Sequence, residues 1–415
     1  MQQNVFEHRL SNGMVILGEP MPWLESVAFS LLLPAGTHNE PNKRLGLAGI
    51  VLEMCQRGAG PYSSRDIVEQ LDFLGVDRTS SVTTFHTSMS MAAMASVLEP
   101  TLEIAAAIVR EPHFPEDELE EARQSALLEL ASIEDDPAQK CFKELKRLRY
   151  GELFGRSSLG DQSGIEETTL DDCKQFQRDY YIPHGAILSL AGNFNWNQFV
   201  ATAERLFGDW EGPPKIKHPK VTANAGNQHL EHDSQQTHIA LAYDGVAYNH
   251  PDYYQGRGLV GILSDGMSSR LFAEVREKRG LVYSVSASSH SLDDCGSVLC
   301  YAGTTAPRAQ ETLNVTLETI HSLNNGIEPD ELKRLKSRVR TSLVMEQESS
   351  SSRSSQMAYD WAYLGRVPSR QELLKAIDAL TCESLLEHFR KYPPRRWSLV
   401  TIGPEPLEFA DAVSQ

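Results

Sequence analysis

Apolar residues recur at nearly every turn over Gly46–Met54, no proline interrupts them, and a Gly/Pro-containing loop follows at residues 58–61. This pattern predicts a helix that ends before the loop. Two longer charged stretches predict helices over Glu116–Ile133, whose acidic first turn suits the helix dipole, and over Asp330–Glu348. Apolar or alternating runs predict strands at Val27–Leu33, Thr79–Met91, Ala186–Ala191, His238–Tyr243, Ser284–Ser289, Ser297–Ala302 and Trp397–Ile402, with a hairpin turn at Ser11–Gly13.

The order of these elements is repeated along the chain. Leu47–Ile50 is matched by Leu259–Ile262 at an offset of 212 residues, and Asp117–Leu119 by Asp330–Leu332 at 213. Three single residues near the end of each copy, Tyr181, Pro183 and Gly192, are matched at an offset of 211 by Tyr392, Pro394 and Gly403. Matches in the same order at a nearly constant offset predict two copies of one fold.

The repeat and the composition of the chain predict an N-terminal half at residues 1–211, a linker at 212–224 and a C-terminal half at 225–415. The linker combines Gly212-Pro213-Pro214 with basic and polar residues, which is typical of a solvated connector. Strands and helices alternate irregularly within each half. This favours the α/β class of the α+β type, with a mainly antiparallel sheet and helices packed on one face in each half.

The bulk properties narrow the classes of function. A chain of 415 residues can hold two domains with full cores, and its formal charge of −17 argues against nucleic acid or an anionic membrane as the main partner. Apolar runs stay below the ~18 residues of a membrane span, and the N-terminus resembles neither a signal peptide nor an organelle presequence. We therefore expect a cytoplasmic protein. Its six cysteines are scattered without a C-x-x-C pair and are expected to be buried thiols.

The predicted helix near residue 50 places positions 49, 52 and 53 on one face. With His, Glu and His there, the helix would carry H-x-x-E-H, which supplies two zinc ligands and a general base. This chain has Gly49, Leu52 and Glu53 instead. Glycine and leucine offer no donor atom to a metal, and leucine cannot accept a proton, so this helix cannot build the zinc site.

This helix and the preceding Pro34–Thr37 resemble the metal-binding region of the pitrilysin/insulinase-type inverted-zincin peptidases, in the branch with processing-peptidase-like subunits. The most specific match is Gly266–Ser284, which resembles a family segment with an arginine and a tyrosine seven residues apart, here Arg276 and Tyr283. The resemblance covers nearly the whole chain. It implies two similar halves that face each other as a clamshell around a chamber.

The resemblance also assigns roles to single residues. It makes Glu129, 80 residues after Gly49, the counterpart of the third zinc ligand. One carboxylate, even beside Glu53, falls short of the three protein ligands of a catalytic zinc site and would hold Mg²⁺ or Ca²⁺ only weakly. The alternative for both glutamates is a polar, solvated wall of the chamber.

Arg276 and Tyr283 are implied to reach the substrate near the scissile bond. A guanidinium and a phenol are both donors that can be aimed at a carbonyl or a developing oxyanion. Local sequence alone leaves another interpretation open, in which Arg276 pairs with a glutamate on its own helix and Tyr283 begins a strand.

The two residues implied to contact the substrate, Arg276 and Tyr283, are thus present, while the two histidines and the glutamate of the zinc motif are missing. This combination resembles the non-catalytic subunit of a heterodimeric processing peptidase, which contributes chamber wall and substrate contacts but is not an enzyme on its own. It predicts no cofactor in this chain, zinc in a paralogous partner, and a peptide substrate that adds a strand at an edge such as Thr79–Thr87. A homodimer agrees with the same evidence. The alternatives are a scaffold protein without a proteolytic role and an active metallopeptidase with a rearranged metal site.

Two further segments are interpreted structurally. His229-Leu230-Glu231-His232 is one residue short of the zinc motif and is predicted to be a polar strand, on which His229 and Glu231 share a face. The serine-rich run Glu348–Ser355 is predicted to break the helical region or form a mobile loop.

Overall fold

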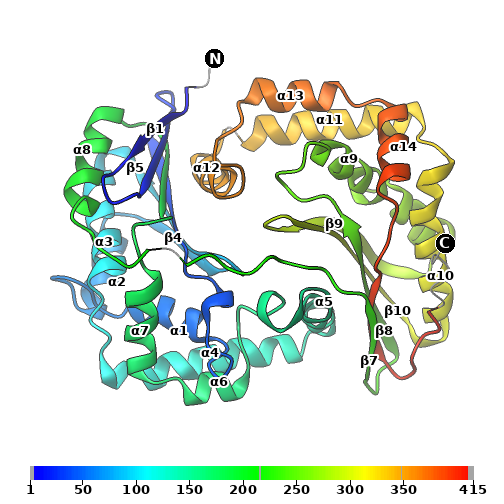
Figure 1. Cartoon of the computed structure of the whole chain (residues 1–415), viewed down its shortest axis with the longest axis horizontal. Coiled ribbons are helices and arrows are strands. Elements are labelled where there is room, and N and C mark those ends of the chain that lie inside the picture. Colours follow the sequence, from blue (N-terminus) through cyan, green and yellow to red (C-terminus); the bar gives the residue numbers. More distant parts are fainter. Residues whose placement is uncertain (1–3, 215, 347, 410–415) are drawn as a thin grey trace. The chain divides into compact units, whose positions relative to one another are not determined.

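The computed structural model describes residues 4–214, 216–346 and 348–409, which fold into two compact units (Figure 1). Each unit is assembled from three separate stretches of the chain. Unit 1 comprises Met1–Ala131, Arg156–His218 and Val344–Ser369, and unit 2 comprises Ser132–Gly155, Pro219–Leu343 and Arg370–Gln415.

Unit 1 is built on a six-stranded sheet with the strand order β1-β2-β6-β3-β5-β4. Neighbouring strands are antiparallel except β2 and β6, which are parallel. The predicted N-terminal hairpin is present as β1 and β2. The strands are β1 (Phe6–Arg9), β2 (Val15–Pro20), β3 (Ser26–Leu33), β4 (Asp77–Val82), β5 (Thr87–Met94) and β6 (Ile187–Gly192).

Helices cover both faces of this sheet. Alternate side chains of β3, such as Phe29 and Leu31, join the larger core with α1 to α4 and α6 to α8, while Leu32 on the opposite face packs near Met357 of α12. Figure 1 shows α12, in orange, beside the strands of this unit. The helices are α1 (Leu47–Cys55), α2 (Ser64–Phe73), α3 (Leu98–Arg110), α4 (Leu119–Glu134), α6 (Gln162–Glu167), α7 (Leu170–Tyr180), α8 (Trp196–Phe207) and α12 (Ser350–Leu364), with short 3-10 turns at Thr37–Asn39, Ala95–Val97 and Glu116–Glu118.

Unit 2 is built on a five-stranded sheet with the order β7-β11-β8-β10-β9, in which only the β7–β11 pair is parallel. Most of its helices share a core with one face, and α5 (Pro137–Phe154) packs on the other face through Cys141 and Leu145. The strands are β7 (Gly226–Glu231), β8 (Gln236–Gly245), β9 (Val282–Leu292), β10 (Cys295–Thr305) and β11 (Ser398–Gly403). The helices are α9 (Tyr253–Ser264), the π-helix η4 (Phe272–Lys278), α10 (Ala309–His321), α11 (Pro329–Glu346), α13 (Arg370–Asp378) and α14 (Cys382–Lys391), with 3-10 turns at Ala306–Arg308 and Ser322–Asn325.

The strand orders confirm the internal duplication. The order β2-β6-β3-β5-β4 in unit 1 is the same as β7-β11-β8-β10-β9 in unit 2, and the one parallel pair occupies the same place in both sheets. The predicted α/β class with mainly antiparallel sheets is therefore confirmed. Helices on one face only were expected, and this detail is wrong. The central strands β3, β6, β8 and β11 are buried along nearly their whole length and need cover on both faces.

The compact units differ from the predicted halves at residues 1–211 and 225–415. Helix α5 comes from the first copy of the repeat but belongs to unit 2, and α12 comes from the second copy but belongs to unit 1. Each copy thus supplies the helix that covers the second face of the other copy's sheet. The predicted linker at residues 212–224 contains the boundary between His218 and Pro219.

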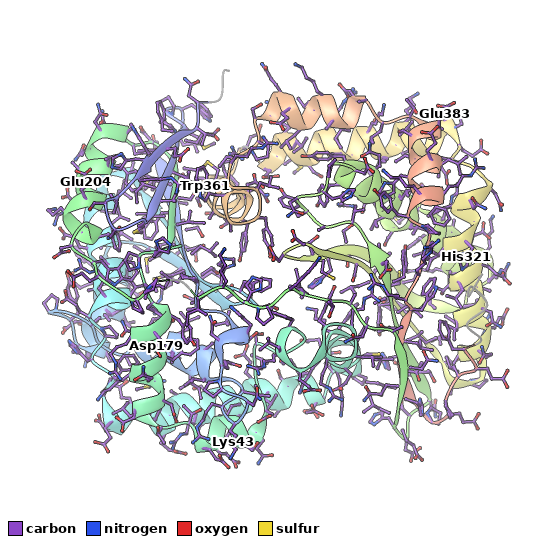
Figure 2. The ribbon with its side chains drawn as sticks, viewed as in Figure 1. Lys43, Asp179, Glu204, His321, Trp361 and Glu383 are labelled. Atoms are coloured by element: carbon purple, nitrogen blue, oxygen red, sulfur yellow. The ribbon has the colours of Figure 1, made fainter. Side chains whose placement is uncertain are left out.

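A buried arginine fixes each of these two exchanged helices. Arg353 of α12 donates from Nε to Oε2 of Glu19 on β2 at 2.6 Å, and both side chains are almost fully buried. The same helix carries Trp361, labelled in Figure 2, whose ring centre lies 5.3 Å from the Arg9 guanidinium carbon. Arg149 of α5 is fully buried and pairs with Asp244 of β8 at 2.6 Å. Burial and ion pairing together define where each helix lies on its sheet.

The structure also bears on four other expectations. Thr79–Met91 is not one strand, because a turn closed by the bond from Thr83 N to His86 O separates β4 from β5. The serine-rich run is helical from Ser350, since Ser349 caps α12 by accepting a hydrogen bond from the Ser352 N–H.

All six thiols are free, and four are buried, while Cys295 and Cys382 are partly exposed. Among the described ranges, no helix combines the length and apolar character that a membrane span requires.

Candidate functional site

The helix α1 carries three of the four positions at which the sequence predicts a degenerate metal site. It begins after Gly46, whose φ of +100° is one that glycine adopts without strain. Its first turn is held by Glu40, whose Oε1 accepts hydrogen bonds from the N–H groups of Gly46 at 3.2 Å and Ala48 at 2.9 Å. The buried side of α1 packs in the core of unit 1, which leaves Gly49 and Glu53 on the opposite side.

Glu40 makes the stability of this helix depend on pH. Burial raises the pKa of its carboxyl to about 8, although the hydrogen bonds from Ala48 and Gly46 and the charge of Arg156 act against this. The unfolded chain releases this proton near its ordinary pKa of about 4.5, while the folded chain keeps it to about pH 8. The contribution of Glu40 is therefore fully present below pH 4.5 and is lost as the pH rises toward 8.

Glu40→Gln should remove this pH dependence, because an amide keeps an oxygen acceptor for both N–H groups but does not ionise. We expect wild-type stability to fall between about pH 5 and pH 8 relative to the variant, with a slope of at most about 1.4 kcal/mol per pH unit for one proton. Urea unfolding of both proteins at several pH values measures the difference. Parallel stability curves would show that Glu40 is already ionised in the folded chain.

A cavity of about 320 Å³ brings the four predicted positions together. Gly49, Leu52 and Glu53 of α1 line it with Glu129 of α4. The third wall is the edge strand β4, which contributes its C-terminal half, residues 80–82. A Cβ added at Gly49 would meet only Ser158 O, at 3.6 Å, so this position has space for a side chain. The cavity therefore has room for a metal-binding side chain at position 49, but glycine does not supply one.

Arg57, one turn beyond Glu53, lies among three carboxylates. Its Nη2 is 3.0 Å from Glu53 Oε1, and its Nη1 is 3.1 Å from Glu118 Oε2 and 3.2 Å from Glu121 Oε2. Burial alone would lower the pKa of Arg57, but the charge and hydrogen bonds of Glu53, and then the bonds to Glu121 and Glu118, raise it overall. Glu53 is thus part of an ion pair whose cation comes from the chain itself. The sequence analysis missed Arg57, although the i,i+4 spacing from Glu53 could have indicated the pair.

These residues do not fit a catalytic zinc ion. Gly49 and Leu52 have no donor atom, and the Glu53 carboxylate is held by Arg57. Within residues 4–214, 216–346 and 348–409, no group of three or more His, Cys, Asp or Glu side chains is placed to hold a metal. The predicted strand at His229 is correct: His229 Nδ1 lies 2.8 Å from Thr401 Oγ1 of β11, and β7 ends at Glu231.

Arg276 and Tyr283 lie close together in unit 2. Arg276 is on the π-helix η4, and its guanidinium carbon is 4.8 Å from the ring centre of Phe272 and 5.3 Å from that of Tyr283. The guanidinium is therefore flanked by two aromatic rings, and Tyr283 is 86% exposed. A π-helix is rare and is often found at functional sites. The two residues form a pair of a half-buried guanidinium and an exposed phenol.

The purely local interpretation of Arg276 is wrong. Across the described part of the chain its guanidinium makes no ion pair, and Glu274 on the same helix pairs with Lys278 instead, at 2.5 Å. The local interpretation of Tyr283 is correct, because it is the second residue of β9. β9 is also an edge strand, so this pair lies at the edge of the sheet of unit 2.

Comparison with known proteins identifies the family. The model described as insulinase (peptidase family M16) matches residues 17–160, and the model described as peptidase M16 inactive domain matches residues 167–339. The chain belongs to the M16 peptidase family. The first match contains the α1 cavity, and the second contains the Arg276–Tyr283 pair.

Relatives in the M16 family match over nearly their whole length. An uncharacterized zinc protease of Rickettsia felis is 25% identical over 409 residues, covering 98% of this chain and 99% of the relative. The uncharacterized zinc protease YmxG of Bacillus subtilis is 28% identical over 402 residues, covering 95% and 97%. Those proteins are named for zinc, whereas Gly49 and Leu52 on α1 of this M16 chain offer no donor atom.

Solved structures support the M16 fold. A peptidase M16 inactive domain from Pseudomonas fluorescens superposes with a TM-score of 0.90 at 24% identity, covering 98% of this chain and 99% of that one. A protease from Helicobacter pylori gives a TM-score of 0.89 at 19% identity, covering 98% and 100%. At these identities the likeness concerns the fold, and the chemistry of the site has to come from this chain's own residues.

Proposed function

We propose that this M16-family chain is a non-catalytic peptidase homologue, the inactive subunit of a heterodimeric processing-type metallopeptidase. The observation that carries the proposal is the replacement on α1 of a zinc ligand by Gly49 and of the general base by Leu52, together with the pairing of Glu53, at the second ligand position, to Arg57. Zinc and the general base would be supplied by a paralogous partner with an intact H-x-x-E-H helix. The six free thiols support a reducing compartment such as the cytoplasm.

In this proposal the chain contributes to peptide binding. The unpaired edge of β4 lies beside the cavity lined by α1 and could add a peptide as a further strand. Arg276 and Tyr283 would donate hydrogen bonds to a peptide carbonyl, and the fixed charge of Arg276 would favour an oxyanion more than a neutral carbonyl. Bond cleavage would take place at the partner's metal.

The first experiment identifies the partner. The full-length chain carries an affinity tag, is purified under mild conditions from its native source, and its stoichiometric partners are identified by mass spectrometry. We expect a paralogue with H-x-x-E-H and peptidase activity that requires both chains. Stoichiometric partners without this motif would favour a scaffold role, and cleavage by the tagged chain alone would favour an active enzyme.

Arg276→Ala should lower turnover by the assembled complex by about 10- to 100-fold, the range for losing one charged donor to the transition state. Assembly should not weaken, since the contacts of Arg276 with residues that the structure describes are ring contacts within its own unit. Arg279→Ala is the matched control, because Arg279 ends the same helical segment and lies 3.9 Å from Glu318. Unchanged turnover in Arg276→Ala would remove this residue from the substrate site.

A further inference from the structure

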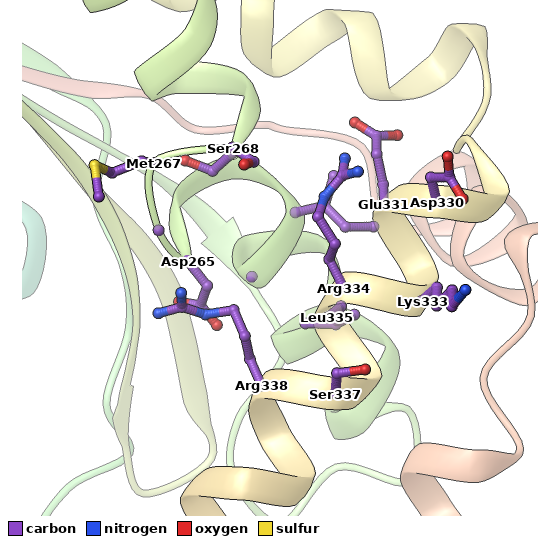
Figure 3. A pocket seen from close by; sticks show the side chains of 14 residues that line it. Asp265, Met267, Ser268, Asp330, Glu331, Lys333, Arg334, Leu335, Ser337 and Arg338 are labelled. Atoms are coloured by element: carbon purple, nitrogen blue, oxygen red, sulfur yellow. The ribbon is translucent and has the colours of Figure 1, made fainter.

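Unit 2 contains a second cavity, of about 620 Å³, which shares no residue with the α1 cavity or with the Arg276–Tyr283 pair. It lies between the loop Asp265–Ser269, which follows α9, and one face of α11 (Figure 3). Ile262, Met267 and Leu335 contribute apolar side chains to its lining. Its volume lies within the range of about 300–1,000 Å³ that is usual for ligand pockets.

The α11 side of this cavity is strongly basic. Residues 333–340 contain five lysines and arginines and no acid, in a chain whose net charge is −17. Two of these residues are bound elsewhere: Lys336 donates to Asp378 O at 2.8 Å, and Arg340 pairs with the Asp378 carboxylate at 2.5 Å. The other three, Lys333, Arg334 and Arg338, line the cavity.

Two of the three acids that line the cavity, Glu331 and Asp265, are paired with arginines outside the lining, and the third is Asp330 in the first turn of α11. Glu331 is bound by Arg270 through two hydrogen bonds of 2.7 Å, and Asp265 lies 3.4 Å from Arg257. By contrast, Lys333, Arg334 and Arg338 make no ion pair or hydrogen bond through their side chains with any residue that the structure describes. Because these three cations are set against one acid without a described cation partner from outside the lining, Asp330, the lining keeps a net positive charge.

Gly266 helps to place one of these cations. A Cβ at Gly266 would come within 2.5 Å of Arg338 Nη1, so the guanidinium lies directly over the glycine backbone. The φ of +97° at Gly266 also disfavours any other residue. Arg334 and Arg338 are four residues apart and project from the same side of α11, as Figure 3 shows. The loop and the helix together present two guanidinium groups beside an apolar surface.

We propose that this cavity binds an oxyanion, a carboxylate or a phosphate, carried by an apolar body. Arg334 and Arg338 bind the anion, since guanidinium groups donate paired hydrogen bonds to such oxygens. Ile262, Met267 and Leu335 contact the apolar part. The site is separate from the proposed function and would remain valid if no peptidase partner existed.

Calorimetric titration of the full-length chain with three probes tests the proposal and identifies the source of the anion. The probes are the peptide acetyl-Leu-Glu-Leu-Glu-amide, the same peptide with glutamine in place of glutamate, and phenyl phosphate. Titration at about 150 mM salt screens contacts with distant charges. We expect binding of the glutamate peptide or of phenyl phosphate, whichever anion the site accepts, and none of the glutamine peptide.

Two double variants on α11 distinguish binding of the anion in the cavity from nonspecific attraction of the anion to the basic helix. Arg334→Gln/Arg338→Gln should weaken binding of the accepted anion by at least about tenfold, as expected for the loss of two charge-assisted contacts. The matched control Lys336→Gln/Arg340→Gln removes the same charge outside the cavity and should change binding less than about threefold. Equal loss in both double variants, or no binding of either anion, would overturn the proposal. All four positions are at least partly exposed, so circular dichroism should show both variants folded.

Discussion

Arg149→Ala should lower the free energy of unfolding by about 3 kcal/mol, the lower end of the range for breaking a buried ion pair. Arg149 is fully buried in α5 and donates to Ser297 Oγ at 3.1 Å, to Asn224 O at 2.9 Å, to Arg396 O and to Asp244 Oδ1 at 2.6 Å. The substitution also removes this donor from two backbone carbonyl oxygens, of which Asn224 O keeps the Ser398 hydroxyl as a donor at 2.9 Å. The estimate is at the lower end because Asp244 keeps a second cation, Arg396, at 2.8 Å.

Urea unfolding of wild type and variant measures this effect. Arg147→Ala is the matched control on the same helix, since Arg147 is 47% exposed and bonds to Glu144 and Glu152 near the surface. Its cost should stay below about 1 kcal/mol. Equal effects of the two substitutions would contradict the conclusion that Arg149 fixes α5 on the sheet of unit 2.

Restoring the missing donors on α1 should create a zinc site. The variant Gly49→His/Leu52→Glu/Glu53→His is expected to bind about one zinc per chain, because it recreates H-x-x-E-H beside Glu129, which gives the three protein ligands of a catalytic site. The cavity has space for the new side chain at position 49. Replacing Glu53 also releases Arg57, which keeps Glu118 and Glu121 as partners.

Elemental analysis after dialysis against trace zinc measures the metal content of the restored variant. Adding Glu129→Gln is the matched control, since it removes one of the three ligands and should weaken zinc binding by at least about tenfold. A folded triple variant that binds no zinc would mean that α1 and α4 do not have the geometry of a metal site. An unchanged affinity with Glu129→Gln would exclude Glu129 as the third ligand.

Much of the fold could be predicted from residue patterns, because the duplication repeats both apolar runs and turn residues. Helix α1 was predicted to within one residue at each end, since its apolar positions and the following loop are local signals. The exchange of α5 and α12 could not be predicted. An amphipathic pattern indicates that a helix buries one face, but it does not indicate which sheet that face covers.

Prediction of the candidate site from the sequence has the same limit, because local patterns do not indicate tertiary contacts. The missing ligand at Gly49 and the missing general base at Leu52 could be predicted because a metal motif is a local pattern of residue types. The three-way pairing of Arg57 depends on the place where the 3-10 turn Glu116–Glu118 and the first turn of α4 meet α1, which only tertiary structure determines. Likewise, the basic run on α11 is visible in the sequence, but the cavity exists because the Asp265–Ser269 loop lies opposite it.

The most direct test of the central claim is the zinc content of the wild-type chain purified alone, with a peptidase assay on the same sample. The account predicts no zinc above background and no cleavage that a chelator abolishes. About one zinc per chain, together with chelator-sensitive cleavage, would contradict it, because the chain would then hold a catalytic metal without a ligand at Gly49 or a general base at Leu52.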